Sequence, residues 1–136
     1  MKDGFYRIAA ATPPVRVADC EKNKMEIKKL IEKAAGEGAA AVIFPELSLT
    51  GYTCADLFKQ KTLLRTAEQN LRELIAETKK LDILCAVGVP VPYKGALYNC
   101  VAVFKDGELL GLPAKKISPI TMNFTSYVIS HPVPTA

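Results

Sequence analysis

AAAVIFPELSLTGYTCADLF, residues 39–58, is the stretch from which the organisation of this chain follows. It begins with a short apolar run rich in Val and Ile, bounded by Gly38 and Pro45. Such a run indicates a β-strand buried on both faces of a sheet. Glu46, the acidic residue just past the strand, should therefore emerge at the carboxyl edge of the sheet, where ligands bind in open α/β sheets.

Glu46 is the first candidate for a catalytic residue. Its neighbours Phe44, Leu47 and Leu49 are apolar, and apolar surroundings disfavour the charged form of a carboxyl group. We therefore expect the pKa of Glu46 to be raised towards the range of a general base. The alternative is a solvated loop acid or a cap for the next element, because spacing alone does not separate these roles.

The nine residues from Phe44 to Tyr52, FPELSLTGY, resemble the first catalytic segment of the nitrilase (carbon-nitrogen hydrolase) superfamily. The continuation TCADLF, residues 53–58, resembles one branch of it, the amino-terminal glutaminase domains of glutamine-dependent NAD synthetases. The resemblance implies an α-β-β-α sandwich and a Glu-Lys-Cys catalytic triad. It places the glutamate of the triad at Glu46 and a substrate-binding residue at Tyr52. It also implies that glutamine is hydrolysed and its ammonia passed to an ATP-dependent domain that amidates deamido-NAD.

Composition and charge indicate a single α/β domain of a soluble protein. The 136 residues are 49% apolar and 24% charged, as in ordinary globular domains. The net charge of +4 is modest and its cations are scattered among acids, so no nucleic-acid or membrane surface is expected. The absence of a signal peptide and of a transmembrane run predicts a cytoplasmic protein.

No cofactor is expected to bind this chain. It contains no glycine-rich phosphate loop, which argues against ATP binding, and the resemblance assigns ATP and deamido-NAD to a separate synthetase domain. For the full-length family, the resemblance implies glutamine as the small-molecule substrate. For the full-length family, the resemblance implies a homo-oligomer.

The cysteines and the histidine are weak candidates for a site. Cys20, Cys54, Cys85 and Cys100 form no CxxC pair and have no histidine at ligand spacing, which speaks against zinc. Cys54 lies near Glu46 in the sequence, but in the family pattern this cysteine is not the nucleophile. His131, the single histidine, has no placed partners and is not expected to be catalytic.

The hydrophobic pattern predicts alternating strands and helices. Apolar residues recur at helical spacing after Asp19, a plausible N-cap, and again from Lys61 to Lys80. Lys105-Asp106-Gly107-Glu108 is typical of a hairpin turn. Strands are expected over residues 6–11, 39–44, 83–89, 97–104 and 109–112. Pro90 and Pro92 should end the third of these strands. This order predicts a mixed sheet with two helices on one face and an apolar second face, a partial nitrilase-like sandwich whose second sheet would come largely from residues outside this chain.

Lys115 is the second candidate for a catalytic residue. After Gly111 the family pattern has a proline and then the catalytic lysine, and alignment on Gly111 and Pro119 places that lysine at Lys115, with Lys116 as the alternative. An ammonium beside the nucleophile would stabilise the oxyanion that forms when a thiolate attacks an amide. The competing interpretation is that both lysines only solubilise a loop.

Residues 1–116 and 117–136 are expected to differ in origin. From Ile117 onward the family pattern is lost, and we hypothesise a shifted reading frame. Met122 has the single codon ATG and the codon of Asn123 begins with AA, so a shift of one base yields GAA, the glutamate that the family pattern has there. The last twenty residues would then be an aberrant, poorly ordered tail.

These features favour a truncated glutaminase domain. Glu46 and Lys115 supply two members of the triad, and the nucleophilic cysteine is expected to be missing, so the chain alone should be inactive. One alternative is a fragment of another nitrilase branch, such as an aliphatic amidase or a carbamoylase. The other is a noncatalytic α/β module that associates with a partner through its uncovered sheet face.

Overall fold

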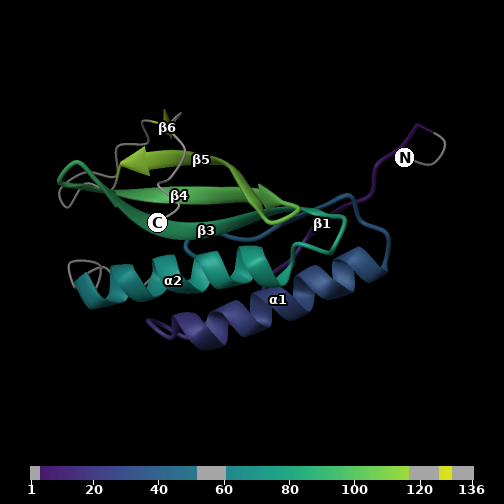
Figure 1. The fold of residues 1–136 in the computed structure, drawn as a ribbon, viewed down its shortest axis with the longest axis horizontal. Coiled ribbons are helices and arrows are strands. Elements are labelled where there is room, and N and C mark those ends of the chain that lie inside the picture. Colours follow the sequence, from purple (N-terminus) through teal and green to yellow (C-terminus); the bar gives the residue numbers. More distant parts are fainter. Residues whose placement is uncertain (1–3, 52–60, 117–125, 130–136) are drawn as a thin grey trace.

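The computed structural model describes residues 4–51, 61–116 and 126–129. Within them the chain forms one six-stranded sheet in the order β1-β2-β3-β4-β5-β6, with two helices packed on one of its faces (Figure 1). The elements are β1 (Ile8–Ala10), α1 (Cys20–Gly36), β2 (Ala41–Ile43), α2 (Lys61–Glu77), β3 (Leu84–Tyr93), β4 (Ala96–Lys105), β5 (Glu108–Lys116) and β6 (Ser126–Ile129).

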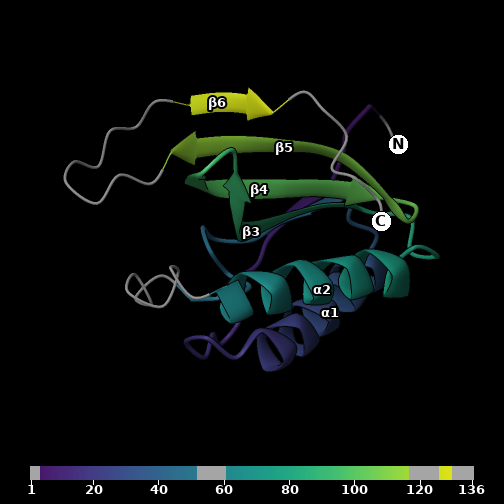
Figure 2. The ribbon, with the colours of Figure 1, turned by 60° about the vertical axis from the view of Figure 1, so that its left-hand side comes forward.

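The sheet is mixed, as predicted. β1, β2 and β3 are parallel neighbours, joined by the crossover helices α1 and α2. β3, β4, β5 and β6 are antiparallel neighbours, and β6 lies beside β5 at the edge of the sheet (Figure 2). The turn between β4 and β5 uses positive φ at Asp106 (54°) and Gly107 (82°), which confirms the hairpin predicted from the Asp-Gly pair.

The helices begin and pack as the sequence pattern predicts. Asp19 caps α1 by accepting a hydrogen bond from the backbone N–H of Lys22 at 3.1 Å. The two helices are also joined by an ion pair between Lys24 Nζ on α1 and Glu73 Oε2 on α2, 2.7 Å apart. The lysine side chain is only 10% exposed, so this contact lies at the margin of the core.

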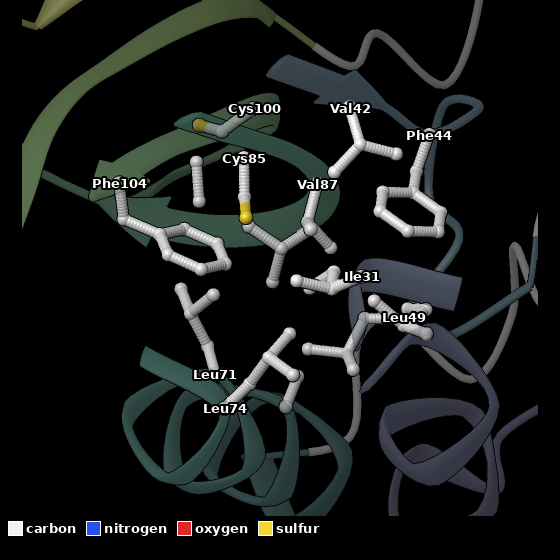
Figure 3. Close-up of a cluster of buried hydrophobic side chains, with 14 of the residues drawn as sticks. Ile31, Val42, Phe44, Leu49, Leu71, Leu74, Cys85, Val87, Cys100 and Phe104 are labelled. Atoms are coloured by element: carbon white, nitrogen blue, oxygen red, sulfur yellow. The ribbon is translucent and has the colours of Figure 1, made fainter. Parts of the chain in front are cut away.

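The hydrophobic core lies between the helices and one face of the sheet, called here the inner face. Figure 3 shows side chains from the sheet meeting side chains from both helices. Several are fully or almost fully buried: Ile27, Ile31, Val42, Leu74, Cys85, Val87, Cys100, Ala102 and Phe104. Burial of this contiguous apolar surface is the main stabilising contribution to the fold.

The opposite face, called here the outer face, is apolar but open to solvent. Ile8 on β1 is 63% exposed and Ile43 on β2 is 51% exposed. Val42, the neighbour of Ile43 on β2, points to the inner face and is fully buried. The prediction that β2 is buried on both faces is therefore wrong for this chain. The reason is that the described residues supply a helical layer for one face only (Figure 1), although the side chains of both faces are apolar.

The prediction that Pro90 and Pro92 end β3 is also wrong, because the strand continues to Tyr93. The backbone groups of Ala86 and Gly88 face the β2 side, where their carbonyls accept from Phe44 and Leu49. Backbone groups of alternate residues in a strand point to the same side, so those of Pro90 and Pro92 point the same way as those of Ala86 and Gly88. β2, however, pairs with β3 only as far as Ala86. The missing N–H groups of the two prolines therefore face the edge that β2 has left, where a proline costs no ladder hydrogen bond.

Candidate active site

Glu46 lies in the loop after β2, and this loop crosses β3 at Gly88. A Cβ atom at position 88 would come within 2.6 Å of the Pro45 carbonyl oxygen and 2.8 Å of the Glu46 carbonyl carbon, and would also meet the Leu47 nitrogen. Only a residue without a side chain permits this approach. The glycine on β3 thus sets how closely the loop that carries Glu46 lies on the sheet.

A buried asparagine on α1 forms hydrogen bonds that fix the same loop. Asn23 is 1% exposed, and its Nδ2 donates to the Leu49 carbonyl at 2.9 Å and to the Arg16 carbonyl at 2.7 Å. Its Oδ1 accepts from the Arg16 N–H at 2.7 Å. Because its amide is fully used in joining two loops, Asn23 fixes the loop from Leu47 to Gly51 against the start of α1. Sequence reasoning missed it, since a polar residue within a helical pattern gives no signal of a tertiary contact.

Lys115 lies near the end of β5, and its side chain reaches Glu46. Lys115 Nζ donates to Glu46 Oε1 at 2.9 Å, across 69 positions of sequence. The expected strand over residues 109–112 extends to Lys116, so Lys115 occupies a strand and not a loop. Lys116, the alternative candidate, is the next residue along β5 and is opposite Tyr98 in the register. The structure therefore brings together the two residues that the sequence analysis selected as catalytic candidates.

Glu46 and Lys115 line a small pocket of about 110 Å³ on the outer face. Its other lining residues are Asn99, Val101, Pro113 and Ala114. Asn99 is directly opposite Lys115 in the register of β4 and β5, and sequence reasoning did not select it. The only available signal was an amide within an otherwise apolar strand, and strands tolerate such a residue for many structural reasons.

The surroundings of the Glu46 carboxylate differ from those that the sequence predicted. Phe44, Leu47 and Leu49 are buried, but they point into the core, and the Glu46 side chain itself is 45% exposed. The carboxylate lies beside an ammonium group, not within an apolar enclosure. The main feature of the surroundings of the Glu46 carboxylate is therefore the opposite charge of Lys115, and not desolvation by these three apolar neighbours.

The described cysteines do not reach this pocket. Cys85 and Cys100 point to the inner face, where they lie within the core (Figure 3), and burial raises the pKa of each thiol to about 12. Cys20, at the start of α1, is also buried. Tyr52, Cys54 and His131 lie outside the described residues, so the substrate-binding role of Tyr52 stays a prediction.

The described part of the chain has no group of three or more His, Cys, Asp or Glu side chains that could hold a metal ion. Of the described residues that line the pocket, Glu46 alone is of one of those four types. Across the residues that the structure describes, neither helix combines the length and the apolar content needed to cross a membrane. The chemistry on offer at the pocket is thus that of a carboxylate, an ammonium and a carboxamide.

Comparison with known proteins places the chain in a family. The model of the carbon-nitrogen hydrolase family matches residues 7–131. A glutamine-dependent NAD(+) synthetase from Aquifex aeolicus is 39% identical over 111 residues, which are 82% of this chain and 19% of the relative. One from Mycobacterium tuberculosis is 32% identical over 121 residues, which are 89% of this chain and 18% of the relative. The chain thus spans about a fifth of the length of these relatives.

Solved structures agree with this comparison. A glutamine-dependent NAD(+) synthetase from Cytophaga hutchinsonii superposes with a TM-score of 0.76 at 34% identity, over 81% of this chain and 19% of that one. An amidase from Nesterenkonia sp. superposes with a TM-score of 0.67 over 85% of this chain and 44% of that one. At 22% identity the amidase supports the fold alone. The predicted nitrilase-like α/β architecture is confirmed.

Proposed function

This chain belongs to the carbon-nitrogen hydrolase family, and we propose that it carries the general base and the cationic residue of a glutamine-hydrolysing site. One observation carries the proposal: Lys115 Nζ and Glu46 Oε1 are 2.9 Å apart at the rim of a pocket, although 69 positions separate them in the sequence. An isolated surface ion pair contributes little to stability. A carboxylate and an ammonium that share a pocket have the geometry expected of an acid-base pair.

The proposed chemistry is amide hydrolysis through a thioester. Glu46 takes the proton of a cysteine thiol, and the sulfur bonds to the amide carbon of the substrate. Lys115 stabilises the negative charge that develops on the oxygen. The C–N bond then breaks, and Glu46 returns the proton to the leaving nitrogen, so that ammonia departs. A water molecule, deprotonated in turn by Glu46, cleaves the thioester and releases the carboxylic acid and the thiol.

Glutamine is the substrate that the relatives favour. The NAD(+) synthetases from Aquifex aeolicus and Cytophaga hutchinsonii are glutamine-dependent by name and are 39% and 34% identical to this chain. We infer that glutamine is hydrolysed at the Glu46 and Lys115 site and that the ammonia serves the amidation of deamido-NAD. ATP and deamido-NAD would be bound by a synthetase domain, and not by the residues of this pocket.

We further propose that the chain does not hydrolyse glutamine alone. The nucleophile must be a thiol that reaches the pocket in its ionised form. Cys85 and Cys100 are on the inner face and their pKa values are raised to about 12, so at neutral pH both are protonated. Cys20 is buried in the core. By the family pattern, Cys54 is not the nucleophile either.

Ammonia release from glutamine tests the proposal that the chain is inactive alone. The purified chain and a Glu46→Gln variant are incubated with glutamine, and ammonia is measured with a coupled enzyme. We expect no glutamine-dependent release from either protein. Release by the wild type above that of Glu46→Gln would show that the chain has its own nucleophile; Cys54→Ser would then identify whether Cys54 supplies it.

The open outer face favours a second candidate function, an α/β module that associates through the sheet. Ile8 and Ile43 leave more than half of their surface exposed on that face, and apolar surface gathered on one exposed face is typical of association sites. Sedimentation velocity distinguishes the two functions. A concentration-dependent dimer that Ile43→Lys dissociates would support the assembly function, whereas a monodisperse monomer would contradict it.

The proposal for residues 117–136 is tested separately, at the level of the gene. The family match extends to residue 131, and we propose that a shifted reading frame accounts for the residues that depart from the family pattern after residue 116. Sequencing the gene from the codon of Gly107 onward, in all three frames, tests this. A shifted frame that encodes a cysteine-bearing nitrilase segment would support the proposal, and a frame without one would contradict it.

A further inference from the structure

We propose that Asn99 binds the carboxamide of the substrate in the Glu46 and Lys115 pocket, as the residue that orients the amide for attack. The inference rests on the proposed function and adds a residue to it. No side-chain hydrogen bond among the described residues explains Asn99 structurally, and it lines the same pocket as the two charged residues. Its position, its unused hydrogen-bonding groups and the size of the pocket each support this role.

The register of the sheet places Asn99 beside the charged pair. Asn99 on β4 is directly opposite Lys115 on β5, and directly opposed residues point to the same face of a sheet. On β4 its neighbour Cys100 points to the core, so Asn99 points to the outer face. The Lys115 side chain extends from its place opposite Asn99 to Glu46. The Asn99 carboxamide and the ion pair therefore line the same pocket.

The amide group of Asn99 forms no hydrogen bond through Oδ1 or Nδ2 with any described residue, although the residue is half-buried. The other described asparagines behave differently: Asn23 uses its amide in three hydrogen bonds and Asn70 donates to the Thr66 carbonyl at 2.8 Å. A half-buried carboxamide without a partner has both a donor and an acceptor to offer to a ligand.

A primary carboxamide is the ligand that matches these groups. It presents one carbonyl acceptor and one N–H₂ donor in a plane, which pair with the Nδ2 donor and the Oδ1 acceptor of an asparagine. The pocket volume of about 110 Å³ has room for a small polar group, so it accommodates the terminal amide of a side chain. Val101 and Pro113 give its wall an apolar surface for the adjoining methylene.

Acetamide is a probe of this size, and its binding can be followed by NMR on the full chain without any variant. Proton–nitrogen correlation spectra are recorded during titration with acetamide, and then with acetone, which keeps the carbonyl and the size but lacks the N–H₂ group. We expect acetamide to shift the side-chain amide signals of Asn99 together with the signals of Lys115, and acetone to bind about tenfold more weakly.

Two variants sharpen the titration. Asn99→Ser, which removes the carboxamide, should weaken acetamide binding about tenfold and abolish the preference over acetone. Gln69→Ser removes a side-chain amide from α2, on the other side of the sheet, and should leave both affinities unchanged. If Asn99→Ser unfolds the chain, the shifts of the Asn99 amide in the wild type still decide the question.

The outcomes separate this inference from the proposed function. If acetamide shifts Lys115 and Glu46 but leaves the Asn99 side-chain amide unmoved, or binds no better than acetone, Asn99 does not bind the substrate and the proposed acid-base pair survives. If none of the three residues responds to acetamide, this pocket is not an amide-binding site, and the proposed function fails with the inference.

Discussion

The two faces of the sheet are built from similar apolar strands but have different surroundings. On the inner face, Val42 and Phe104 are almost completely buried under the helices, and no polar group of the proposed chemistry lies there. On the outer face, Ile8 and Ile43 are largely exposed, and Glu46 and Lys115 form their ion pair on this same face. The difference shows that the stability of this chain and its candidate chemistry are located on opposite sides of one sheet, so that they can be altered separately.

The largest expected effect is a loss of stability confined to the inner face. Ile31, fully buried on α1, and Ile43, 51% exposed on β2, are each replaced by alanine. We expect Ile31→Ala to lower the free energy of unfolding by about 2–5 kcal/mol through lost burial and a cavity. Ile43→Ala should change it by about 0.5 kcal/mol or less. Urea unfolding followed by circular dichroism measures both. Equal losses would mean that the outer face is covered in solution.

The second prediction concerns the point where the outer face carries the Glu46 loop. Gly88→Ala places a Cβ against the backbone of Pro45, Glu46 and Leu47, and we expect a loss of about 1–3 kcal/mol. Gly36→Ala at the end of α1 is the matched control, because a Cβ there meets nothing within 4 Å. The control should be neutral or stabilising by up to about 1 kcal/mol.

Thermal unfolding of both glycine variants tests this difference. NMR shifts of the Lys115 side chain report in addition whether the loop has moved away from β5. A Gly88→Ala protein with wild-type stability and an unchanged Lys115 signal would contradict the argument that the close approach of loop and strand positions Glu46.

Sequence reasoning succeeded where a local pattern has a local cause. The Asp19 cap, the Asp106-Gly107 turn and the two amphipathic helices depend on residues a few positions apart, so their patterns are readable from the chain. The mixed sheet followed from the order of these elements. Glu46 and Lys115 came from a strand-end argument and from a family resemblance, and the structure brings them within 2.9 Å of each other.

Sequence reasoning failed where tertiary contacts decide. The strand containing Pro90 and Pro92 continues because β2 has already ended beside it, and no local signal reports the length of a neighbouring strand. The open face of β2 has the same composition as a covered one. Asn23 and Gly88 act through contacts with residues that are distant in sequence, and Asn99 reaches the pocket only through the register of β4 and β5. A single sequence therefore does not distinguish these three from ordinary helix and strand residues.

A third prediction tests whether the inner side also supports the site. Asn23→Ala removes three hydrogen bonds and leaves the buried Leu49 carbonyl without its donor. We expect a loss of about 1–3 kcal/mol together with a change in the NMR signals of Glu46. Asn70→Ala, which removes one bond to the Thr66 carbonyl within α2, should leave the Glu46 signals unchanged. Unaltered Glu46 signals in Asn23→Ala would show that Asn23 stabilises the fold without positioning the loop.

A smaller effect is expected from the ion pair between the helices, and it depends on pH. The hydrogen bond to Glu73 raises the pKa of Lys24 above its ordinary 10.5, and the hydrogen bond from Lys24 lowers the pKa of Glu73 below its ordinary 4.5. The contribution of Glu73 to the free energy of unfolding is therefore complete above pH 4.5, and it is lost as the pH falls through the lowered pKa of this carboxyl group. The contribution of Lys24 is complete below pH 10.5, and it is lost as the pH rises through the raised pKa of this ammonium group.

Lys24→Met is the variant that tests this pH dependence. The difference in unfolding free energy between wild type and variant should narrow as the pH falls from 7 to 3. Glu77, whose Oε1 is 3.6 Å from Lys24 Nζ, contributes to the same interaction. Lys29→Met, which removes a more exposed pair with Glu26, should show a weaker dependence. A difference that stays constant down to pH 3 would contradict the assigned coupling.

The smallest effect on stability is expected at the residues that matter most for the proposed chemistry. Glu46 and Lys115 are 45% and 40% exposed, and ion pairs so exposed contribute about 0–1 kcal/mol because water screens them. Glu46→Gln, Lys115→Met and the double variant therefore give a cycle whose coupling free energy should be below about 1 kcal/mol in urea unfolding. A coupling of several kcal/mol would mean that the pair holds β5 to the loop after β2, and its position would then be explained by folding. A coupling near zero would mean that the pair does not stabilise the fold. The alignment of the two side chains in the pocket then needs an explanation other than stability, and binding of an amide is such an explanation.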